Sequence, residues 1–352
     1  MDSKERITRM LQHKEADRVA ITDMPWNGTV RNWIKQGMPA DADWRDFFGV
    51  DKFEIYGVDV SPRYERKVLE ETAEYRIVTT EWGATMKEFL EQDSTPEFLD
   101  FKISTPKAWK DAKARMTFDE DRLNLDVLKS VYPAWKKAGA FTAAQFWFGF
   151  DVTHSWASGT ETVLIAMLED PEWVVDMFNC YLDLNIALFD RLWDMGYTFD
   201  AMRWPDDMGY KHNQFFSVQT YRALLKPVHK RAVDWAKQKG IFTILHSCGD
   251  ITPFVPEFVD MGIDALNPLE VKAGVDSLEL KKKFGDKLCL FGGLDALHWH
   301  DPDFAVSEIR RVVPVLKQNG GYICSSDHSI PNDVSLENYR TIVQAMKECG
   351  RY

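Results

Sequence analysis

The scarcity of cysteines and of long apolar runs narrows the class of protein. Its 352 residues include only five cysteines, an odd number scattered along the chain, which argues against a disulfide framework and for reduced thiols. No apolar run approaches the roughly 20 residues that a membrane-spanning helix needs. The charged start MDSKERITRMLQHKEADR also lacks the apolar region of a signal peptide. We therefore expect a cytoplasmic protein that does not insert into a membrane.

Positive charge is also scarce. The chain has 43 Lys and Arg against 55 Asp and Glu, a formal net charge of −12, which repels the phosphate backbone of a nucleic acid. No cluster of Lys and Arg is interleaved with aromatic residues. The Gly-x-Gly-x-x-Gly and Gly-x-x-x-x-Gly-Lys-Ser/Thr signatures of dinucleotide and phosphate binding are missing as well. We expect a small-molecule substrate and no nucleic-acid partner.

Aromatic residues, in contrast, are abundant. The chain contains 13 Trp and 22 Phe. Most aromatic side chains pack in a protein core, but they also form the walls of pockets for apolar or aromatic ligands. The aromatic residues of this protein are thus numerous enough to form both a packed core and the walls of a ligand pocket.

Short apolar runs that end in polar residues alternate with longer segments of helical period, closed by Gly. This alternation, without a linker or repeat, predicts one α/β domain over residues 1–352. Eight such runs favour a closed (β/α)8 TIM barrel over an open doubly wound sheet. Residues 66–90 alternate like a β-hairpin and predict an insertion in the amino-terminal part. The eight predicted strands are RVAITDM, FEIYGVDV, AFTAAQFWFGF, DAMRWPDD, FTILHSCGD, DALNPLE, LCLFGGLD and GYICSSDH.

Ligand-type residues follow the later predicted strands. The chemistry of a (β/α)8 barrel lies at the carboxyl ends of its strands, so these residues predict a ring around one site. They are Asp206, Asp207, His246, Cys248, Glu270, Asp295, Cys324, Asp327 and His328.

His246 and Cys248 form the most informative pair in this ring. Residues i and i+2 of a strand point to the same face, so the imidazole and the thiol converge on one point. Zinc suits this mixture of nitrogen and sulfur best. The pair also fits a hydrogen-bonded core histidine beside a small buried cysteine, and we favour the metal site because of its neighbours.

Those neighbours are Glu270, which closes the next strand, and Cys324 and His328, which close the eighth. A catalytic zinc needs three protein ligands and one open position. Adjacent residues of an extended segment face opposite ways, so only one of Asp206 and Asp207 is expected to enter the pocket, where it would orient substrate or carry a proton. The other would cap the turn or lie in solvent.

The remaining histidines and cysteines of interest carry no chemistry in this interpretation. His154, His298 and His300 have no partner at a metal-binding spacing, and Cys180, Cys289 and Cys349 lie in an apolar helix, in a strand and near the carboxyl terminus.

Five segments together resemble the uroporphyrinogen decarboxylase superfamily, and within it the branch of zinc-dependent, corrinoid-linked methyltransferases. The resemblance extends over essentially the whole chain. HSCGDITPFVPEFVDMGIDALNPLE is most similar to the methyltransferases, which hold zinc with His-x-Cys, a later thiolate and in some cases a Glu. The other four segments are ERITRMLQHKEADRVAI, MRWPDDMG, FGGLDA and SSDHSIPNDVSLENY.

Two departures from the family pattern bear on the activity. True decarboxylases have an Arg-rich amino-terminal motif for the propionates of a tetrapyrrole, whereas DMPWNGTVRNW has only Arg31. A substrate with eight carboxylates needs several fixed cations. His328 occupies the position of the later Cys of the methyltransferases, with Cys324 four residues earlier. Either residue remains a candidate for the third ligand.

The resemblance implies an enzyme that moves a methyl group between a small methylated compound, such as a methyl ether, or a thiol and a corrinoid. Zinc held by His246, Cys248, Glu270 and either His328 or Cys324 would act as a Lewis acid or lower the pKa of an acceptor thiol. No Asp-x-His-x-x-Gly motif for corrinoid binding occurs here, so the corrinoid is expected on a separate protein. The alternatives are a decarboxylase without a metal and a non-catalytic binding barrel.

Overall fold

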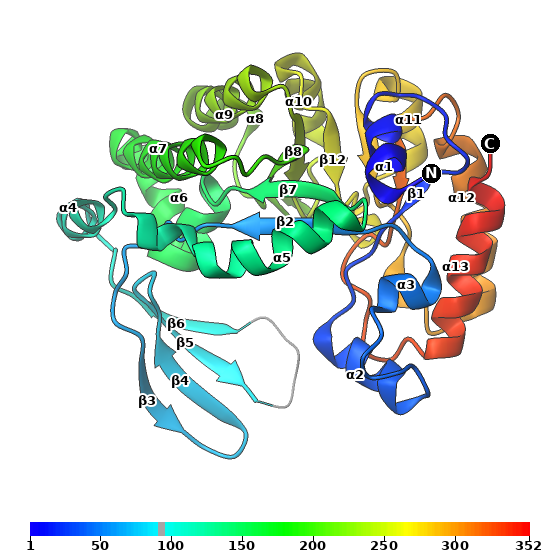
Figure 1. Ribbon diagram of the computed structural model, residues 1–352. Coiled ribbons are helices and arrows are strands. Elements are labelled where there is room, and N and C mark those ends of the chain that lie inside the picture. The colour runs from blue at the N-terminus through cyan, green and yellow to red at the C-terminus, as the bar shows by residue number, and fades with distance from the viewer. Residues whose placement is uncertain (91–95) are drawn as a thin grey trace.

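Eight parallel strands form the central sheet in the computed structural model, which describes residues 1–90 and 96–352 (Figure 1). Each of the eight predicted apolar segments supplies one strand, and the predicted (β/α)8 barrel is confirmed. The strands follow the order β1-β14-β13-β12-β11-β8-β7-β2. Their bounds are β1 Ala20–Ile21, β2 Phe53–Gly57, β7 Phe141–Gln145, β8 Ala201–Pro205, β11 Phe242–His246, β12 Ala265–Asn267, β13 Cys289–Phe291 and β14 Tyr322–Cys324.

Asp51 joins the two edges of this sheet. The backbone N–H of Asp51, just before β2, donates to the carbonyl of Ile21 in β1 at 2.7 Å. The N–H of Ile21 donates to Oδ2 of Asp51 at 2.8 Å. Polar contacts of one residue thus connect β1 and β2 at the amino-terminal end of the barrel.

The helices surround the strands, and both chain termini lie on the side of α1 and α13 (Figure 1). In the part of the chain that the structure describes, no helix is long and apolar enough to cross a membrane. The α-helices are α1 Ser3–Leu11, α2 Asn27–Lys35, α3 Trp44–Phe48, α4 Pro106–Arg115, α5 Leu125–Lys137, α6 Thr160–Glu169, α7 Pro171–Asp194, α8 Val218–Thr220, α9 Lys226–Lys239, α10 Val255–Met261, α11 Ser277–Phe284, α12 Pro302–Leu316 and α13 Leu336–Gly350. Shorter helical turns are η1 Glu120–Leu123, η2 Val152–Ser158, η3 Tyr221–Leu225, η4 Thr252–Phe254, η5 Val271–Ala273 and η6 Ala296–His298.

The predicted hairpin is part of a four-stranded antiparallel sheet that projects from the barrel after β2 (Figure 1). The segment predicted as a hairpin, residues 66–90, forms three strands of this sheet, and a fourth strand completes it. The four strands are β3 Lys67–Glu71, β4 Tyr75–Thr79, β5 Ala84–Phe89 and β6 Glu97–Phe101. A separate two-stranded hairpin follows β8 and consists of β9 Gly209–Tyr210 and β10 Asn213–Gln214.

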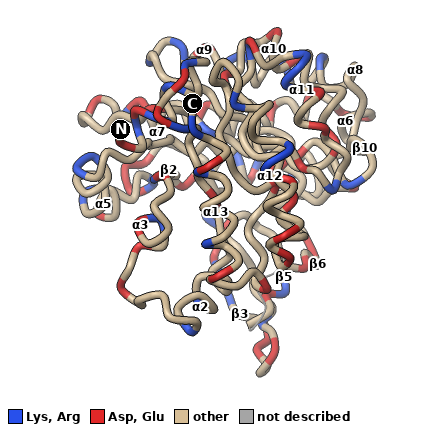
Figure 2. The backbone as a smooth tube through the Cα atoms, turned by 90° about the vertical axis from the view of Figure 1, so that its right-hand side faces the viewer, with Lys and Arg blue, Asp and Glu red and all other residues tan. Residues whose placement is uncertain are grey.

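Aromatic side chains fill the lower part of the barrel interior. The ring of Phe53 on β2 lies 5.4 Å from that of Phe141 on β7 and 6.0 Å from that of Phe291 on β13. On the outside, acidic and basic residues are interspersed along the chain (Figure 2). The interior is therefore packed at its floor, and the polar residues that face inward lie above it, toward the carboxyl ends of the strands.

Candidate metal centre

His246 and Cys248 converge at the carboxyl end of β11. The sulfur of Cys248 lies 3.4 Å from Nε2 of His246. Oδ1 of Asp207, which follows the neighbouring strand β8, lies 3.9 Å from the same nitrogen and accepts the backbone N–H of Cys248 at 2.8 Å. One ligand atom from each of these three residues lies within 4.8 Å of the other two. The nitrogen, sulfur and carboxylate oxygen offer a donor set that fits zinc.

Asn267 fixes which imidazole nitrogen faces this group. The amide nitrogen of Asn267 donates to the carbonyl of Phe291 at 3.2 Å, so its Oδ1 is the acceptor turned toward His246. Nδ1 of His246 lies 2.5 Å from that oxygen and must carry the proton. Nε2 is then left as a bare lone pair beside Cys248, which is the arrangement found in histidines that bind metals.

Burial and charge set the protonation of the pair. Burial lowers the pKa of His246 to about 3, with a further contribution from the nearby Arg203, so the imidazole is neutral. Burial also raises the pKa of the Cys248 thiol well above its ordinary value, helped by the charges of Asp207 and Glu270. A bound cation would reverse this effect on the thiol, because a metal-coordinated cysteine is deprotonated.

Gly249 allows the loop that carries Cys248 to lie against the loop after β8. Its φ is +81°, and a Cβ at this position would fall 2.2 Å from the backbone carbon of Gly209. No other residue type fits such a close approach of two backbones. The His-Ser-Cys-Gly-Asp segment therefore needs this glycine to bring Cys248 beside Asp207.

Glu270 and His328 lie around the three-residue group without joining it. Oε2 of Glu270 accepts the N–H of Gly249 at 2.5 Å, and its other oxygen lies 3.0 Å from Nζ of Lys272. Burial lowers the pKa of His328, with Lys272 also lowering it and Glu270 and Asp207 raising it. His328 thus faces the same space as the group and lines the cavity above it.

Asp206 and Asp207 point in opposite directions, as the alternation of an extended chain requires. Asp206 is fully buried away from the cavity. Its Oδ2 lies 2.7 Å from Nε2 of His229 on α9, and its Oδ1 accepts the N–H of Asp151 at 2.7 Å. Asp207 alone reaches the three-residue group.

Cys324 lies elsewhere. It is fully buried in β14, and its neighbour Ser325 lines the cavity, so the cysteine faces the outer side of the strand. Burial raises its pKa, and the charge of Asp23 raises it further. The structure does not bring Cys324 to the three-residue group.

Asp295 and Asp327 stabilise the loops at the mouth. Asp295 caps η6 through the N–H of Leu297 at 3.2 Å. Asp327 accepts the N–H groups of Ala296 and Val271 at 3.1 and 3.0 Å. Both carboxylates of the predicted ring thus hold backbone, one within its own loop and the other between loops.

Three residues near the site went unassigned in the sequence. Asn267 and Arg203 lie inside predicted strands. Alternation along the strand could have identified Arg203, because it lies four residues before Asp207 and therefore shares its face. Asp151 follows β7, and burial together with Asp207 and Asp206 raises its pKa well above the ordinary value. Nothing in the local sequence marks Asp151 as more than a loop residue.

A cavity of about 1030 Å³ opens at the mouth beside the group. Apolar and aromatic side chains form most of its wall, as a binding site for an organic molecule requires. Its aromatic lining residues are Trp44, Phe53, Trp147 and Phe291, and its charged or titratable ones are Asp23, Arg31, Arg45, Arg203, His246 and His328.

Comparison with known proteins places these features in a family. The sequence profile described as uroporphyrinogen decarboxylase (URO-D) matches residues 149–349. A methylated-thiol–coenzyme M methyltransferase from Methanosarcina mazei is 26% identical over 142 residues, which cover 39% of this chain and 35% of that protein. The match thus spans about a third of that relative's length.

A solved structure gives the likeness of fold. The structure of a methyltransferase from Methanosarcina mazei superposes with a TM-score of 0.65 at 15% identity and covers 99% of both chains. The family profile spans more than half of the sequence and includes β8 and β11, which carry Asp207, His246 and Cys248. The chain belongs to the uroporphyrinogen decarboxylase family.

Proposed function

We propose that the protein is a zinc-dependent methyltransferase that moves a methyl group between a small methylated compound and a corrinoid carried by a separate protein. The observation that carries this proposal is the convergence of Asp207, His246 and Cys248 on one point. The two methyltransferases from Methanosarcina mazei support the assignment of the activity.

The zinc would be held by Nε2 of His246, the sulfur of Cys248 and a carboxylate oxygen of Asp207, with Glu270 and His328 as nearby candidates to complete the set. Cys324 remains a less favoured candidate because it faces away. When bound, zinc supplies a Lewis acid next to the cavity. The side chains of His246 and Asp207 are 21% and 34% exposed, which leaves room for a substrate atom.

The residues of the chain prepare this site. Asn267 holds the imidazole of His246 in one tautomer, and the aromatic wall of the cavity excludes water from the methyl group. In the transfer, the bond from the methyl carbon to oxygen or sulfur breaks, its electron pair stays on the heteroatom, and the methyl group passes to the reduced corrinoid. The departing heteroatom then takes a proton.

We propose Asp151 as the acid that supplies this proton, because its carboxyl interacts through space with Asp207 and Cys248 of the group. Its raised pKa favours the protonated carboxyl, and Ser155 Oγ donates to its Oδ1 at 3.0 Å, which leaves Oδ2 to carry the proton. Asp206 positions this residue through the N–H of Asp151. We assign Asp206 a positioning role and assign Asp207 to the metal.

The test is the zinc content of protein purified without a histidine tag. We expect about one zinc per chain in the native protein, and the loss of it in Cys248→Ala. Cys180→Ala is the matched control, because Cys180 is a partly buried thiol on α7, and it should keep the metal. Methyl transfer from a methyl ether should then require an added corrinoid protein or free cobalamin. A native protein that takes up no zinc on reconstitution would contradict the proposal.

A decarboxylase without a metal is the second candidate. The specific observation in its favour is that Arg31, Arg45 and Arg203 line the cavity, since cations suit a carboxylated substrate. Turnover of a porphyrinogen by zinc-free protein would establish this activity. Its absence, together with methyl transfer by the zinc-loaded protein, would exclude it. The same two assays decide whether the barrel is only a binding protein.

A further inference from the structure

Arg203 differs from the other buried arginines of the described chain. Arg6, Arg122 and Arg203 are each at most 8% exposed. The guanidinium of Arg6 makes four hydrogen bonds, three of them to the carboxylates of Asp17 and Asp51. That of Arg122 makes four hydrogen bonds to backbone carbonyls. The fold thus satisfies two of its three buried guanidinium groups from within.

Arg203 makes a single hydrogen bond, from its NH1 to Oε1 of Gln145 at 2.7 Å. Gln145 is neutral, and no carboxylate of residues 1–90 and 96–352 forms an ion pair with Arg203. A guanidinium has five N–H donors, so most of them have no protein acceptor. A buried charge without a partner is costly to folding, and its presence calls for a partner that comes from outside the chain.

The location of Arg203 shows where such a partner would lie. Arg203 is in register with Gln145 on β7 and Ile244 on β11, and all of these side chains share the inward face with His246, which pairs with Pro205. Arg203 lines the cavity together with Gln145 and His246. The unsatisfied donors therefore lie in the cavity that opens beside the candidate metal centre.

We propose that Arg203 is a specificity-determining residue that binds an oxyanion of the substrate, a carboxylate or a sulfonate. This inference rests on the proposed function and specifies its substrate class: a methyl donor with an aromatic or apolar body and one anionic group. The aromatic residues Trp147, Phe53 and Phe291 suit that body. Asp207 and Cys248 act on Arg203 only through space, and their charges are assigned to zinc in the proposed function.

The test is a binding measurement that needs no catalysis. Isothermal titration calorimetry compares three probes of the same shape: 4-methoxybenzoate, 4-methoxybenzenesulfonate and the neutral 4-methoxybenzyl alcohol. The native protein should bind at least one anion about 10- to 100-fold more tightly than the alcohol, the range of a charge-assisted hydrogen bond. The two anions distinguish a planar carboxylate from a tetrahedral sulfonate.

Two variants locate the effect. Arg203→Gln should reduce the preference for the anion to less than about 3-fold, while Arg203→Lys, which keeps the charge and loses the paired donors, should retain part of it. Arg45→Gln is the matched control, because Arg45 lines the same cavity but already pairs with Asp43 at 2.8 Å and Glu54 at 2.7 Å. It should keep most of the preference.

The outcomes separate this inference from the proposed function. Equal binding of anion and alcohol by the native protein overturns the inference, even where Arg203→Gln does not fold. An unchanged preference in a folded Arg203→Gln also overturns it. The titrations are repeated after EDTA treatment, so a preference that depends on Arg203 in a protein without methyl-transfer activity keeps the inference and refutes the function. Methyl transfer by a protein without that preference keeps the proposed function and refutes the inference about Arg203.

Discussion

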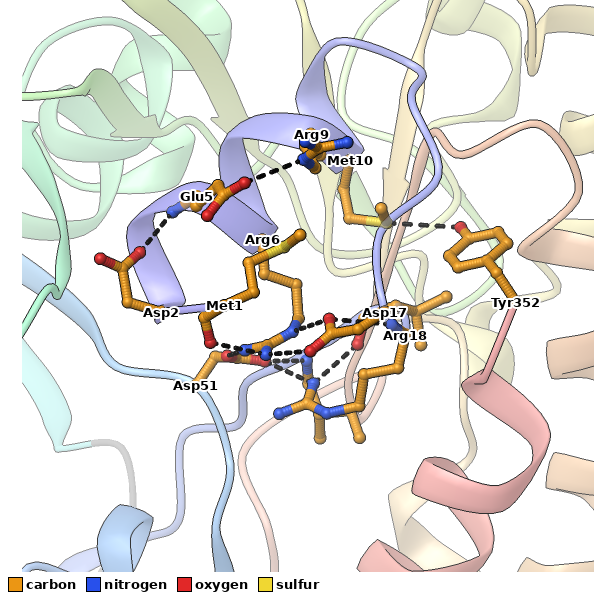
Figure 3. A network of polar contacts seen from close by, with 12 residues as sticks. Met1, Asp2, Glu5, Arg6, Arg9, Met10, Asp17, Arg18, Asp51 and Tyr352 are labelled. Atoms are coloured by element: carbon orange, nitrogen blue, oxygen red, sulfur yellow. Dashed lines mark hydrogen bonds and ion pairs between the residues drawn. The ribbon is translucent and has the colours of Figure 1, made fainter.

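At the amino-terminal end of the barrel, two arginines and two aspartates form a closed network (Figure 3). Arg6 binds Asp17 through Nε at 2.8 Å and also pairs with Asp51. Arg18 binds the second oxygen of Asp51 at 2.7 Å. Two positive charges meet two negative ones, and Asp51 is only 1% exposed. The network needs nothing from outside the chain.

At the carboxyl end, buried carboxyl groups lie close together without such ion pairs. Asp151 and Asp207 have pKa values raised by burial and by neighbouring carboxylates. The histidines nearest to them offer no charge, since burial lowers the pKa of His154 to about 4 and that of His246 to about 3. Arg203 lines the cavity at this end and Lys272 pairs with Glu270, but neither cation forms an ion pair with Asp151 or Asp207.

This difference in charge pairing indicates that the amino-terminal end contributes to stability and the carboxyl end to function. In (β/α)8 barrels the amino-terminal face contributes to stability, and the carboxyl face carries the chemistry. Buried like charges at a mouth cost free energy of folding, and such a cost is typical of sites that bind or react. We therefore expect substitutions at the two ends to change the free energy of unfolding in opposite directions.

The largest effect is expected for Asp51→Asn. It leaves the buried Arg6 and the partly buried Arg18 without their shared carboxylate, which should lower the free energy of unfolding by about 3–5 kcal/mol, as measured by urea denaturation. The control Asp46→Asn removes a carboxylate that is 66% exposed and pairs with Lys52, and it should change the value by less than about 1 kcal/mol. A loss below about 1 kcal/mol for Asp51→Asn would break the comparison.

The next effect depends on pH and concerns Glu308 on α12. Its Oε2 accepts the N–H of Asp295 at the mouth, and burial, followed by the charges of Asp295 and Asp327, raises its pKa to about 7. As the pH falls from about 7 to 4.5, the native carboxyl binds a proton before the unfolded one does, so this group adds stability across that window.

Glu308→Gln should therefore be more stable than the native protein by about 2 kcal/mol at pH 8, and the difference should vanish near pH 4.5. Urea denaturation at several pH values measures it. Glu337→Gln, at an exposed carboxylate that pairs with Arg340, is the control without this window. A pH-independent difference between Glu308→Gln and the native protein would refute the assignment.

A smaller effect of the opposite sign to that of Asp51 is expected for Asp207→Asn. The amide oxygen can still accept the N–H of Cys248, while the repulsion with Asp151 and Glu270 disappears. The free energy of unfolding of metal-free protein should stay the same or rise by up to about 1 kcal/mol, and zinc affinity should fall at least about 10-fold. A loss of stability near that of Asp51→Asn would show that the carboxylates at both ends stabilise the fold.

The smallest effect is expected on the projecting sheet. Glu88 binds Arg66 at 2.7 Å and Arg76 at 2.5 Å, but the two arginine side chains are 38% and 41% exposed. Glu88→Gln should lower the free energy of unfolding by about 0.5 kcal/mol, and less at high salt, because exposed pairs are screened. A loss above about 1.5 kcal/mol that salt does not reduce would contradict this.

Much of the fold could be predicted because its signals are local. All eight barrel strands lie inside apolar runs of the sequence, and helices such as α7 lie in the longer segments of helical period. The projecting sheet was recognised only as a hairpin, because the pairing of β6 with β5 depends on a partner strand that the sequence of β6 does not reveal. Pairing between strands depends on partners that a single segment does not reveal.

The candidate site divides in the same way. The spacing of His246 and Cys248 predicted their convergence, since the period of a strand is a local property. The contribution of Asp207 depended on how β8 sits beside β11, and that of Asn267 on the carbonyl of Phe291, which fixes its amide. That Cys324 is buried outside the cavity, whose wall includes its neighbour Ser325, became clear only from the structure.

Neighbours along the chain were enough to predict the alternation of strands and helices, the excess of acidic charge and the types of residue at the strand ends. The packing of distant segments sets which of those residues meet, which face away, and that Arg203 forms no ion pair with a carboxylate of the described residues. These features depend on distances between segments far apart in sequence. Burial strengthens the interactions at those distances, which shift pKa values and contribute to binding.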